Sequence, residues 1–198
     1  QVVNCTTPSN YFHVLRRQMH RQFRKPLIVM TPKSLLRHRR CISNITEFVS
    51  KSSFHRVLED DAYEKKNNLI SLNKDNQIKK VVMCSGKIYY DLIEEREKTK
   101  KKDVVFVRIE QLYPFPAKTL AKVLKKYKKA EFIWCQEEPK NMGAWNTARN
   151  YIERTLEMIN FKDINIKYVG RSASSTTATG NANKHLAQQK EILEKILK

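Results

Sequence analysis

The chain has 198 residues, of which 40% are hydrophobic and 30% charged, with only four glycines and six prolines. This composition excludes disordered and fibrous proteins and predicts a soluble globular chain with one full domain and part of another. Lys and Arg number 39 against 20 Asp and Glu, a formal net charge of +19, which would attract nucleic acid, an anionic membrane or an acidic partner.

The cysteines predict a reducing compartment and no metal site. Cys5, Cys41, Cys84 and Cys135 are far apart, without a CxxC pair or a Cys/His pair at zinc-ligand spacing. No apolar stretch reaches about 18 residues, so no segment is expected to span a membrane. The chain starts at Gln1 in a strand-like run, which predicts that a preceding part has been cut away or lies elsewhere.

The first 31 residues have the pattern of the tail of an α/β unit. Val2–Cys5 is strand-like, and Thr7 is an N-cap residue before a helix that the apolar spacing extends to about Arg24. Pro26 ends that helix, and Leu27–Met30 is a second short strand. We therefore expect strand, helix and strand in this order.

Residues 32–77 are expected to connect two domains. Ser43 or Asn44 is the N-cap of a short helix that runs to Val49. From Ser50 onward the composition is polar, with almost no periodic apolar signal, as is typical of a connecting segment.

Residues 78–198 contain four strand-then-helix units. This alternation predicts a mostly parallel sheet with helices on both faces, and therefore an α/β domain of three layers. The strands are expected at Lys80–Cys84, Val104–Ile109, Phe132–Cys135 and Ile164–Val169, and the helices near 88–100, 114–127, 145–159 and 186–197.

Polar residues follow the ends of the predicted parallel strands, where such sheets gather ligand and partner surfaces. Ser85-Gly86-Lys87 lies at a strand-to-helix turn whose free N–H groups could hold an anion. GxGxxG and GxxxxGK[ST] are both absent, so a plain turn is the alternative. The other strand ends carry Glu110-Gln111, Gln136-Glu137-Glu138 and Gly170-Arg171.

Glu137 and Glu138 resemble a general acid and base at first sight. Carboxylates adjacent in sequence rarely converge on one atom, and no nearby histidine completes a site. Ion pairing with a neighbouring domain or subunit is therefore favoured. Gln136–Pro139 is interpreted as a polar corner that ends the strand and faces that neighbour.

The histidines form no ligand pattern, and the basic residues near the start of the chain allow two interpretations. A helix and the following strand end could surround one phosphate with cations. The alternative is solvated helix faces, and aromatic residues are not interleaved with the basic ones, which argues against nucleic acid. The residues in question are His13, His20, His38, His55 and His185, and Arg16, Arg17, Lys33, Ser34 and Arg37.

Six ordered motifs resemble one family, the decarboxylating first component of 2-oxoglutarate dehydrogenase, in its C-terminal part. They run through nearly the whole chain, so they are far more specific than any short pattern above. The motifs are FHVLRRQ (12–18), RKPLIVMTPKSLLRH (24–38), VVMCSGKIYYDL (81–92), RIEQLYPFP (108–116), WCQEEPKNMGAW (134–145) and YVGR (168–171).

The resemblance implies that residues 1–31 end a pyrimidine-binding α/β domain and that a connecting segment, 32–77, leads to a transketolase-like C-terminal domain at 78–198. The family binds thiamine diphosphate and magnesium, decarboxylates 2-oxoglutarate, and passes the succinyl group to a lipoyl arm of the succinyltransferase. Its cofactor motif, activating glutamate and active-site histidines have no counterparts here, so no catalytic, cofactor-binding or metal-binding residue is expected in this chain.

The resemblance further implies a homodimer attached to upstream domains, in the bacterial cytoplasm or the mitochondrial matrix. Some members have a nucleotide or acetyl-CoA effector pocket with arginines near this position, which makes Arg16 and Arg17 the candidates. The expected role of the segment is structural or regulatory, without activity alone. The alternatives are a free-standing basic module that binds nucleic acid or another anionic partner, and a relative specific for 2-oxoadipate.

Overall fold

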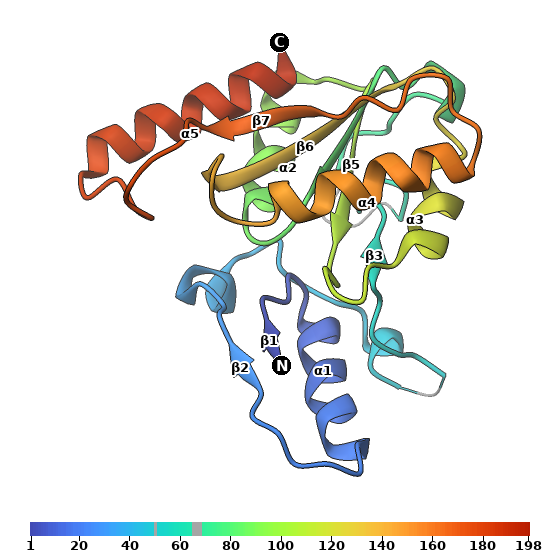
Figure 1. Ribbon diagram of the computed structural model, residues 1–198, viewed down its shortest axis with the longest axis vertical. Helices are drawn as coiled ribbons and strands as arrows, with labels where there is room; N and C mark the ends of the chain where they lie inside the picture. Colours follow the sequence, from blue (N-terminus) through green and yellow to red (C-terminus); the bar gives the residue numbers. More distant parts are fainter. Residues whose placement is uncertain (50, 65–68) are drawn as a thin grey trace. The chain divides into compact units, whose positions relative to one another are not determined.

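A computed structural model describes residues 1–49, 51–64 and 69–198. The chain divides into two compact units, Gln1–Arg56 and Val57–Lys198, which are described separately (Figure 1).

The first unit is a strand, helix and strand. β1 (Val2–Val3) pairs in parallel with β2 (Ile28–Val29), and α1 (Pro8–His20) connects them. The side chain of Thr7 caps α1 by accepting a hydrogen bond from the backbone N–H of Asn10 at 3.2 Å, so the predicted order and N-cap are confirmed.

The predicted end of this helix at Arg24 is wrong, because α1 ends at His20 and Arg21 is already extended. Residues 21–27 instead run back toward β1. The amino group of Gln1 donates to the Pro26 carbonyl at 2.8 Å, and the Gln18 side chain donates to the Lys25 carbonyl.

Two 3-10 turns complete the first unit. They are η1 (Lys33–Arg37) and η2 (Ile45–Glu47). Asn44 caps η2 in a capping box, in which the Glu47 side chain accepts from the Asn44 backbone N–H at 2.9 Å. The expected short helix is therefore present as one turn that stops before Val49.

The second unit is built on a five-stranded sheet in the order β3-β5-β4-β6-β7. Its four long strands are mutually parallel, as predicted, and β3 is antiparallel to β5 at the sheet edge. The strands are β3 (Val57–Leu58), β4 (Lys80–Cys84), β5 (Val104–Ile109), β6 (Glu131–Pro139) and β7 (Lys167–Arg171).

Four helices cover the two faces of this sheet, which confirms the three-layer α/β fold. α2 packs with α5 on one face, and α3 packs with α4 on the other (Figure 1). Their bounds are α2 (Ile88–Thr99), α3 (Ala117–Leu124), α4 (Trp145–Met158) and α5 (Ala182–Leu197). A further 3-10 turn, η4 (Asp75–Gln77), precedes β4.

The core lies between the sheet and its helices. All six residues of β5 are buried, and Trp134 on β6 is the largest fully buried side chain. Each fully buried aliphatic or aromatic side chain contributes about 1.5–3 kcal/mol, so this sheet is where the stability of the second unit originates.

Some predicted strand bounds in this unit are wrong, and one strand was not predicted. β6 does not end at Cys135 but continues to Pro139 through a register irregularity against β7. β7 begins at Lys167, not at Ile164, and ends at Arg171, not at Val169. β3 lies inside the 32–77 stretch, where no strand was expected, since two residues are too few to show an alternating pattern.

Candidate functional site

The carboxyl edge of the parallel sheet is the place where a site is expected on topological grounds. β4 leads through α2 to β5 on one side, whereas β6 leads through α4 to β7 on the other side (Figure 1). β4 and β6 are neighbours, so their connections diverge between them and form a switch point. Open α/β sheets bind ligands in the crevice at such a point.

Four side chains meet at this switch point. Lys87 follows β4, Glu137 lies on β6, Asp91 on α2 and Gln189 on α5. Lys87 Nζ lies 2.6 Å from Asp91 Oδ2 and 3.2 Å from Glu137 Oε1. Gln189 Nε2 donates to Asp91 Oδ2 at 2.9 Å and to Glu137 Oε1 at 3.5 Å. The protein's own charged and polar groups therefore pair with one another at this end of the sheet, and the side chains of Lys87, Asp91 and Glu137 each remain 27% exposed.

The ionisation of this cluster follows from its burial and its charges. Burial lowers the pKa of Lys87, but the hydrogen bonds and charges of Asp91 and Glu137 outweigh it, so the pKa lies above the ordinary lysine value. Burial raises the pKa of Glu137, and the positive charge of Lys87 offsets only part of that increase. Lys87 remains cationic near neutral pH and bridges the two carboxylates.

The two adjacent glutamates have different surroundings in the structure. Glu137 is half-buried in the cluster, whereas Glu138 is exposed. Glu137 thus finds its ion-pair partner, Lys87, within its own unit, and it does not need the neighbouring domain or subunit that the sequence suggested.

The sequence placed Gln136 at the end of a strand but missed its inward orientation. It is buried, and its Oε1 accepts from Trp134 Nε1 at 2.9 Å and from the Trp145 backbone N–H at 3.0 Å. Its Nε2 donates to the carbonyls of Pro139 at 3.1 Å and Met142 at 2.8 Å, and to that of Glu138 at 3.2 Å. The interpretation of Gln136–Pro139 as an outward polar corner is therefore wrong at its first residue. Gln136 holds the loop between β6 and α4 from inside.

Two glycines permit this packing. Gly143 has φ +66°, and a Cβ there would lie 3.0 Å from Gln136 Nε2. A Cβ on Gly170 would lie 2.8 Å from the Gln136 carbonyl oxygen and closer still to the Tyr168 hydroxyl. The YVGR and NMGAW motifs thus have a shared physical cause, the close approach of both segments to Gln136.

The loops after β6 and β7 are joined side by side. Asn141 Nδ2 donates to the Ser174 carbonyl at 2.9 Å, and the Ser174 N–H donates to Asn141 Oδ1 at 3.0 Å. The Lys140 N–H donates to the Arg171 carbonyl at 3.1 Å, and Arg171 Nη1 donates to the Thr177 carbonyl at 3.3 Å. The carboxyl edge therefore ends in one hydrogen-bonded pair of loops.

Two buried ion pairs fix the segment that follows β3. Arg96 donates from Nη2 to Asp60 Oδ1 at 2.9 Å and from Nη1 to Asp60 Oδ2 at 2.5 Å. Arg108 Nη2 donates to Asp61 Oδ1 at 2.8 Å, and the Arg108 guanidinium lies 3.8 Å from the centre of the Tyr89 ring. All four charged residues are buried. In the sequence, Asp60 and Asp61 are two acidic residues in a polar stretch, and nothing there indicates that they form buried ion pairs.

The candidate effector arginines bind within their own unit. Arg16 Nη2 donates to the Ser52 carbonyl at 2.6 Å, and the Arg17 guanidinium lies 4.5 Å from the centre of the Phe54 ring. Burial lowers the pKa of Arg17, and the positive charge of Arg21 adds to that effect. These contacts orient the two side chains toward residues 52–54, and an effector role for them stays a prediction.

The other residues of the proposed phosphate cluster, and the histidines, have separate surroundings. Lys33, Ser34 and Arg37 are exposed on η1. His13 is buried, with Nε2 at 2.7 Å from the Glu47 carbonyl oxygen. In the part of the chain that the structure describes, no group of three His, Cys, Asp or Glu is placed to hold a metal ion. Among the described helices, none has the length and apolar character needed to cross a membrane.

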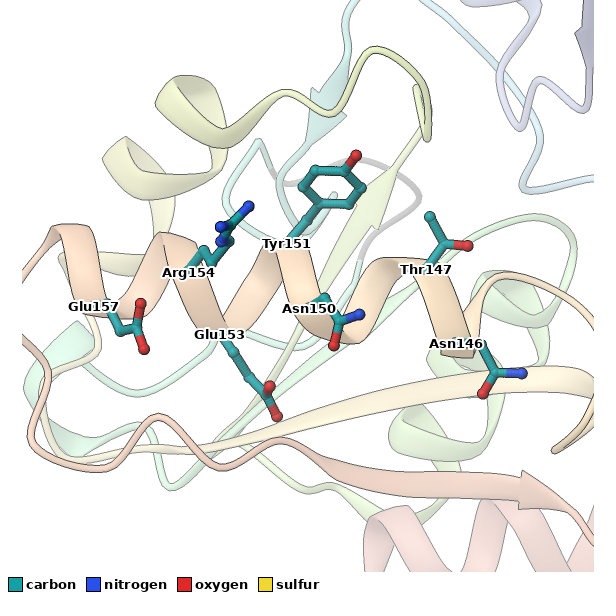
Figure 2. A pocket seen from close by; sticks show the side chains of 7 residues that line it. All are labelled: Asn146, Thr147, Asn150, Tyr151, Glu153, Arg154 and Glu157. Carbon is teal, nitrogen blue, oxygen red and sulfur yellow. The ribbon is translucent and has the colours of Figure 1, made fainter.

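A groove of about 530 Å³ runs along α4. Figure 2 shows that its side chains project along the helix on different sides and do not converge on one point. Ligand pockets are usually lined by several elements and by mostly apolar side chains, so we assign no ligand to this groove. It is lined by Asn146, Thr147, Asn150, Tyr151, Glu153, Arg154 and Glu157.

Comparison with known proteins gives a consistent family. Residues 42–197 match the family model described as 2-oxoglutarate dehydrogenase C-terminal, and residues 1–39 match the transketolase pyrimidine-binding domain. The chain is 57% identical over 197 residues to the 2-oxoglutarate dehydrogenase E1 components of Brucella ovis, Brucella canis and Brucella anthropi. The alignment covers all of this chain and 20% of each relative, so the chain spans about one fifth of their length. The chain therefore belongs to the 2-oxoglutarate dehydrogenase C-terminal family, with the end of a transketolase pyrimidine-binding domain at its start.

Proposed function

We propose that this chain is the C-terminal part of an enzyme that decarboxylates 2-oxoglutarate and passes the succinyl group to the lipoyl arm of a succinyltransferase, a step of the tricarboxylic acid cycle. The support is identity of 57% along the whole chain to proteins named 2-oxoglutarate dehydrogenase E1 component. An oxidoreductase of this kind would work as a homodimer, in the cytoplasm of a bacterium or the mitochondrial matrix of a eukaryote.

Within that enzyme, the proposed role of the second unit is to be a scaffold without activity of its own. The observation that carries this proposal is that the side chains at the switch point pair with one another. Lys87 and Glu137, with Gln189 from α5, lie at the crevice in which α/β sheets of this kind hold a ligand. Side chains paired in this way support packing between elements, and the family's chemistry is assigned to other domains.

Thiamine diphosphate with magnesium is the cofactor proposed for the whole enzyme. Residues 1–56 contain a single acidic residue, Glu47. Its carboxylate accepts hydrogen bonds from the Ser9 hydroxyl at 3.0 Å and from the Asn44 backbone N–H at 2.9 Å. A carboxylate committed in this way does not fit a magnesium ligand or an activator of the cofactor's pyrimidine, so we propose that residues 1–56 supply neither group.

The proposed domain plan assigns residues 1–31 to the end of the pyrimidine-binding domain, 32–77 to a connecting segment and 78–198 to the C-terminal domain. The exposed apolar side chains of α1 support the first assignment. Tyr11, Leu15 and Met19 recur every four residues on one face of the helix, and all are exposed. We propose that the upstream part of the pyrimidine-binding domain covers them. Arg16 and Arg17 remain the proposed effector residues, beside residues 52–54, which their side chains contact.

A complementation assay tests this function. The E1 component of Brucella ovis, shortened by the fifth that aligns with this chain, is expected to be inactive with 2-oxoglutarate, thiamine diphosphate and magnesium. Adding the 198-residue chain should restore decarboxylation, whereas the chain alone should release no carbon dioxide. The intact relative is the positive control.

Each outcome bears on a separate statement. Turnover by the isolated chain would contradict the scaffold role. A shortened relative that stays inactive with this chain, but regains activity with its own C-terminal fifth, would contradict the assignment to this enzyme.

A further inference from the structure

The positive charge of the second unit is concentrated at the edge where its parallel strands begin. We define the amino-edge surface as the lysines just before β4, β5 and β6 and the lysine that starts β7. Lys80, the first residue of β4, is left out because its Nζ donates to the Ile196 carbonyl at 2.8 Å. The lysines are Lys79, Lys100, Lys101, Lys102, Lys128, Lys129 and Lys167.

The topology brings these lysines together although they are far apart in sequence. β5, β4, β6 and β7 are parallel neighbours, so the loops that lead into them lie at one edge. The backbone confirms this adjacency, because the Lys79 N–H donates to the Asp103 carbonyl at 2.8 Å and the Glu131 N–H donates to the Lys79 carbonyl at 2.8 Å. Adjacent strands are about 4.8 Å apart, so the row is about 14 Å wide.

Two carboxylates in this edge pair with two of the lysines, and a third, Asp163, lies near enough to Lys167 to contribute to its raised pKa. Lys79 Nζ lies 3.2 Å from Asp103 Oδ2, and Lys167 Nζ pairs with Glu131 Oε1. Over the described ranges, with residues 50 and 65–68 left aside, the other five lysines of the surface form no ion pair. Lys100, Lys102, Lys128 and Lys129 are exposed, and Lys101 is half-buried.

The carboxyl edge of the sheet does not share this excess of positive charge, so the excess does not simply reflect the overall composition of the chain. There the charges nearly balance, because four carboxylates face three cations. The carboxylates are Asp91, Glu110, Glu137 and Glu138, and the cations are Lys87, Lys140 and Arg171. The field of the second unit is therefore positive on its amino edge in particular.

We propose that the amino-edge surface binds an acidic polypeptide segment of a partner protein. A row about 14 Å wide matches roughly three acidic side chains on one face of an extended segment, whose repeat on that face is about 6.8 Å. Ammonium groups on flexible stems suit carboxylates that approach from several directions.

The composition of the surface favours a polypeptide over nucleic acid. The segments that lead into the four strands, 79–80, 100–103, 128–131 and 162–167, contain no arginine, whose bidentate guanidinium groups recognise phosphate. They also contain no aromatic side chain on which an unpaired base could stack. This inference depends only on the second unit, so the binding experiment tests it independently of the reaction proposed above.

A charge-reversal experiment on the full chain tests the proposal. The probe is a fluorescein-labelled peptide of ten glutamates, titrated at about 50 mM salt, where exposed charges are weakly screened. The edge variant carries Lys101→Glu, Lys102→Glu, Lys128→Glu and Lys129→Glu. The matched control carries Lys118→Glu, Lys122→Glu, Lys184→Glu and Lys190→Glu on exposed faces of α3 and α5, with the same change in net charge.

We expect the edge variant to lose about tenfold or more in affinity and the control less than about threefold, because only the first removes the local field. Circular dichroism verifies that both variants are folded. If the edge variant fails to fold, the same four positions changed to glutamine replace it.

Equal losses in the two variants would overturn the proposal, since binding would then follow net charge alone. Failure of the unmodified chain to bind the peptide would overturn it as well. A DNA duplex that binds more tightly than the peptide, and loses affinity only in the edge variant, would replace the acidic polypeptide with nucleic acid.

Discussion

At the scale of single residues, Gln136 shows how one buried amide can organise a surface loop. Its carbonyl oxygen accepts from two N–H donors, and the two N–H groups of its amide nitrogen are shared among three carbonyls, all within the 134–145 stretch. Burying a polar group costs little free energy when all its hydrogen bonds are made. Removing that group leaves each of its buried partners without a hydrogen bond, and each then costs its full desolvation free energy. The loop geometry therefore depends on this side chain more than on the exposed glutamate beside it.

The substitution Gln136→Leu tests this dependence. It leaves the N–H groups of Trp134 and Trp145 without their acceptor, so we expect a loss of about 3 kcal/mol in the free energy of unfolding. Glu138→Gln, at an exposed neighbour, is the matched control and should stay within about 0.5 kcal/mol. Urea denaturation measures both, and equal effects would show that Gln136 does not hold the loop.

The buried thiols give a prediction about reactivity and pH. Burial raises the pKa of Cys84 to about 12 and that of Cys135 well above its ordinary value. In alkylation by iodoacetamide at about pH 8, the half-buried Cys41 should therefore react about tenfold faster than either. Mass spectrometry of the labelled peptides measures the rates, and labelling of Cys84 as fast as Cys41 would contradict its burial.

The same pKa shift makes stability depend on alkaline pH. The folded thiol of Cys84 keeps its proton to about pH 12, whereas the unfolded thiol loses it near 9.0. The resulting stability is present in full below pH 9.0 and is lost as pH rises toward about 12. Cys84→Ala should flatten the decline of unfolding free energy over this range, and an unchanged slope would refute the assignment.

At the scale of elements, the long strands and helices were predictable because their patterns are long. The apolar runs of β4 and β5 match the predicted bounds, since strands buried on both faces read as continuous hydrophobic stretches. β3 has two residues and was missed, and its attachment depends on Asp60 and Asp61. Residue order alone did not show that these carboxylates meet arginines about 36 and 47 residues further along the chain.

The candidate site was likewise predictable only in part. Topology placed Ser85, Glu137 and their neighbours at the carboxyl edge, because parallel strands end together. Which of these side chains pair was beyond the sequence, because the partners of Lys87 come from separate elements, α2 and β6, and Gln189 joins them from α5. The inward orientation of Gln136 also depends on a register irregularity in β6 that no periodic pattern announces.

The attachment of the segment after β3 can be tested by Asp60→Asn. Asp60 is buried and accepts hydrogen bonds from Arg96, from the Phe106 N–H and from the Ala62 N–H. Removing its charge leaves the buried guanidinium with only the distant carboxylate of Glu97, whose Oε1 lies 3.9 Å from Arg96 Nε, so we expect a loss of about 3 kcal/mol. Glu191→Gln, in an exposed ion pair with Lys195, makes the same carboxylate-to-amide change and should cost less than about 0.5 kcal/mol.

Urea denaturation of the two variants gives the comparison directly. A cost for Asp60→Asn as small as that for Glu191→Gln would mean that the pair with Arg96 is not closed in solution. A double variant with Arg96→Met should recover part of the loss, because it removes the orphaned charge as well.

At the scale of the whole molecule, the two units differ in whether they can fold alone. The second unit has a five-stranded sheet covered on both faces. In the described part of the first unit, the buried apolar side chains are Cys5, Val14 and Leu35 only. At about 1.5–3 kcal/mol for each buried side chain, they cannot offset an ordering cost of about 1–2 kcal/mol per residue over 56 residues.

We therefore expect a fragment of residues 57–198 to unfold cooperatively in urea, with a midpoint close to that of the main transition of the full chain. A fragment of residues 1–56 should show the circular dichroism of an unfolded chain, since its two-stranded sheet and exposed α1 face need apolar cover from elsewhere. Amide hydrogen exchange on the full chain provides the control, with strong protection expected in β4, β5 and β6 and weak protection in α1. Cooperative unfolding of the shorter fragment, or equal protection of α1 and β5, would show that the first unit stabilises itself and would remove the argument that its exposed face is covered by an upstream domain.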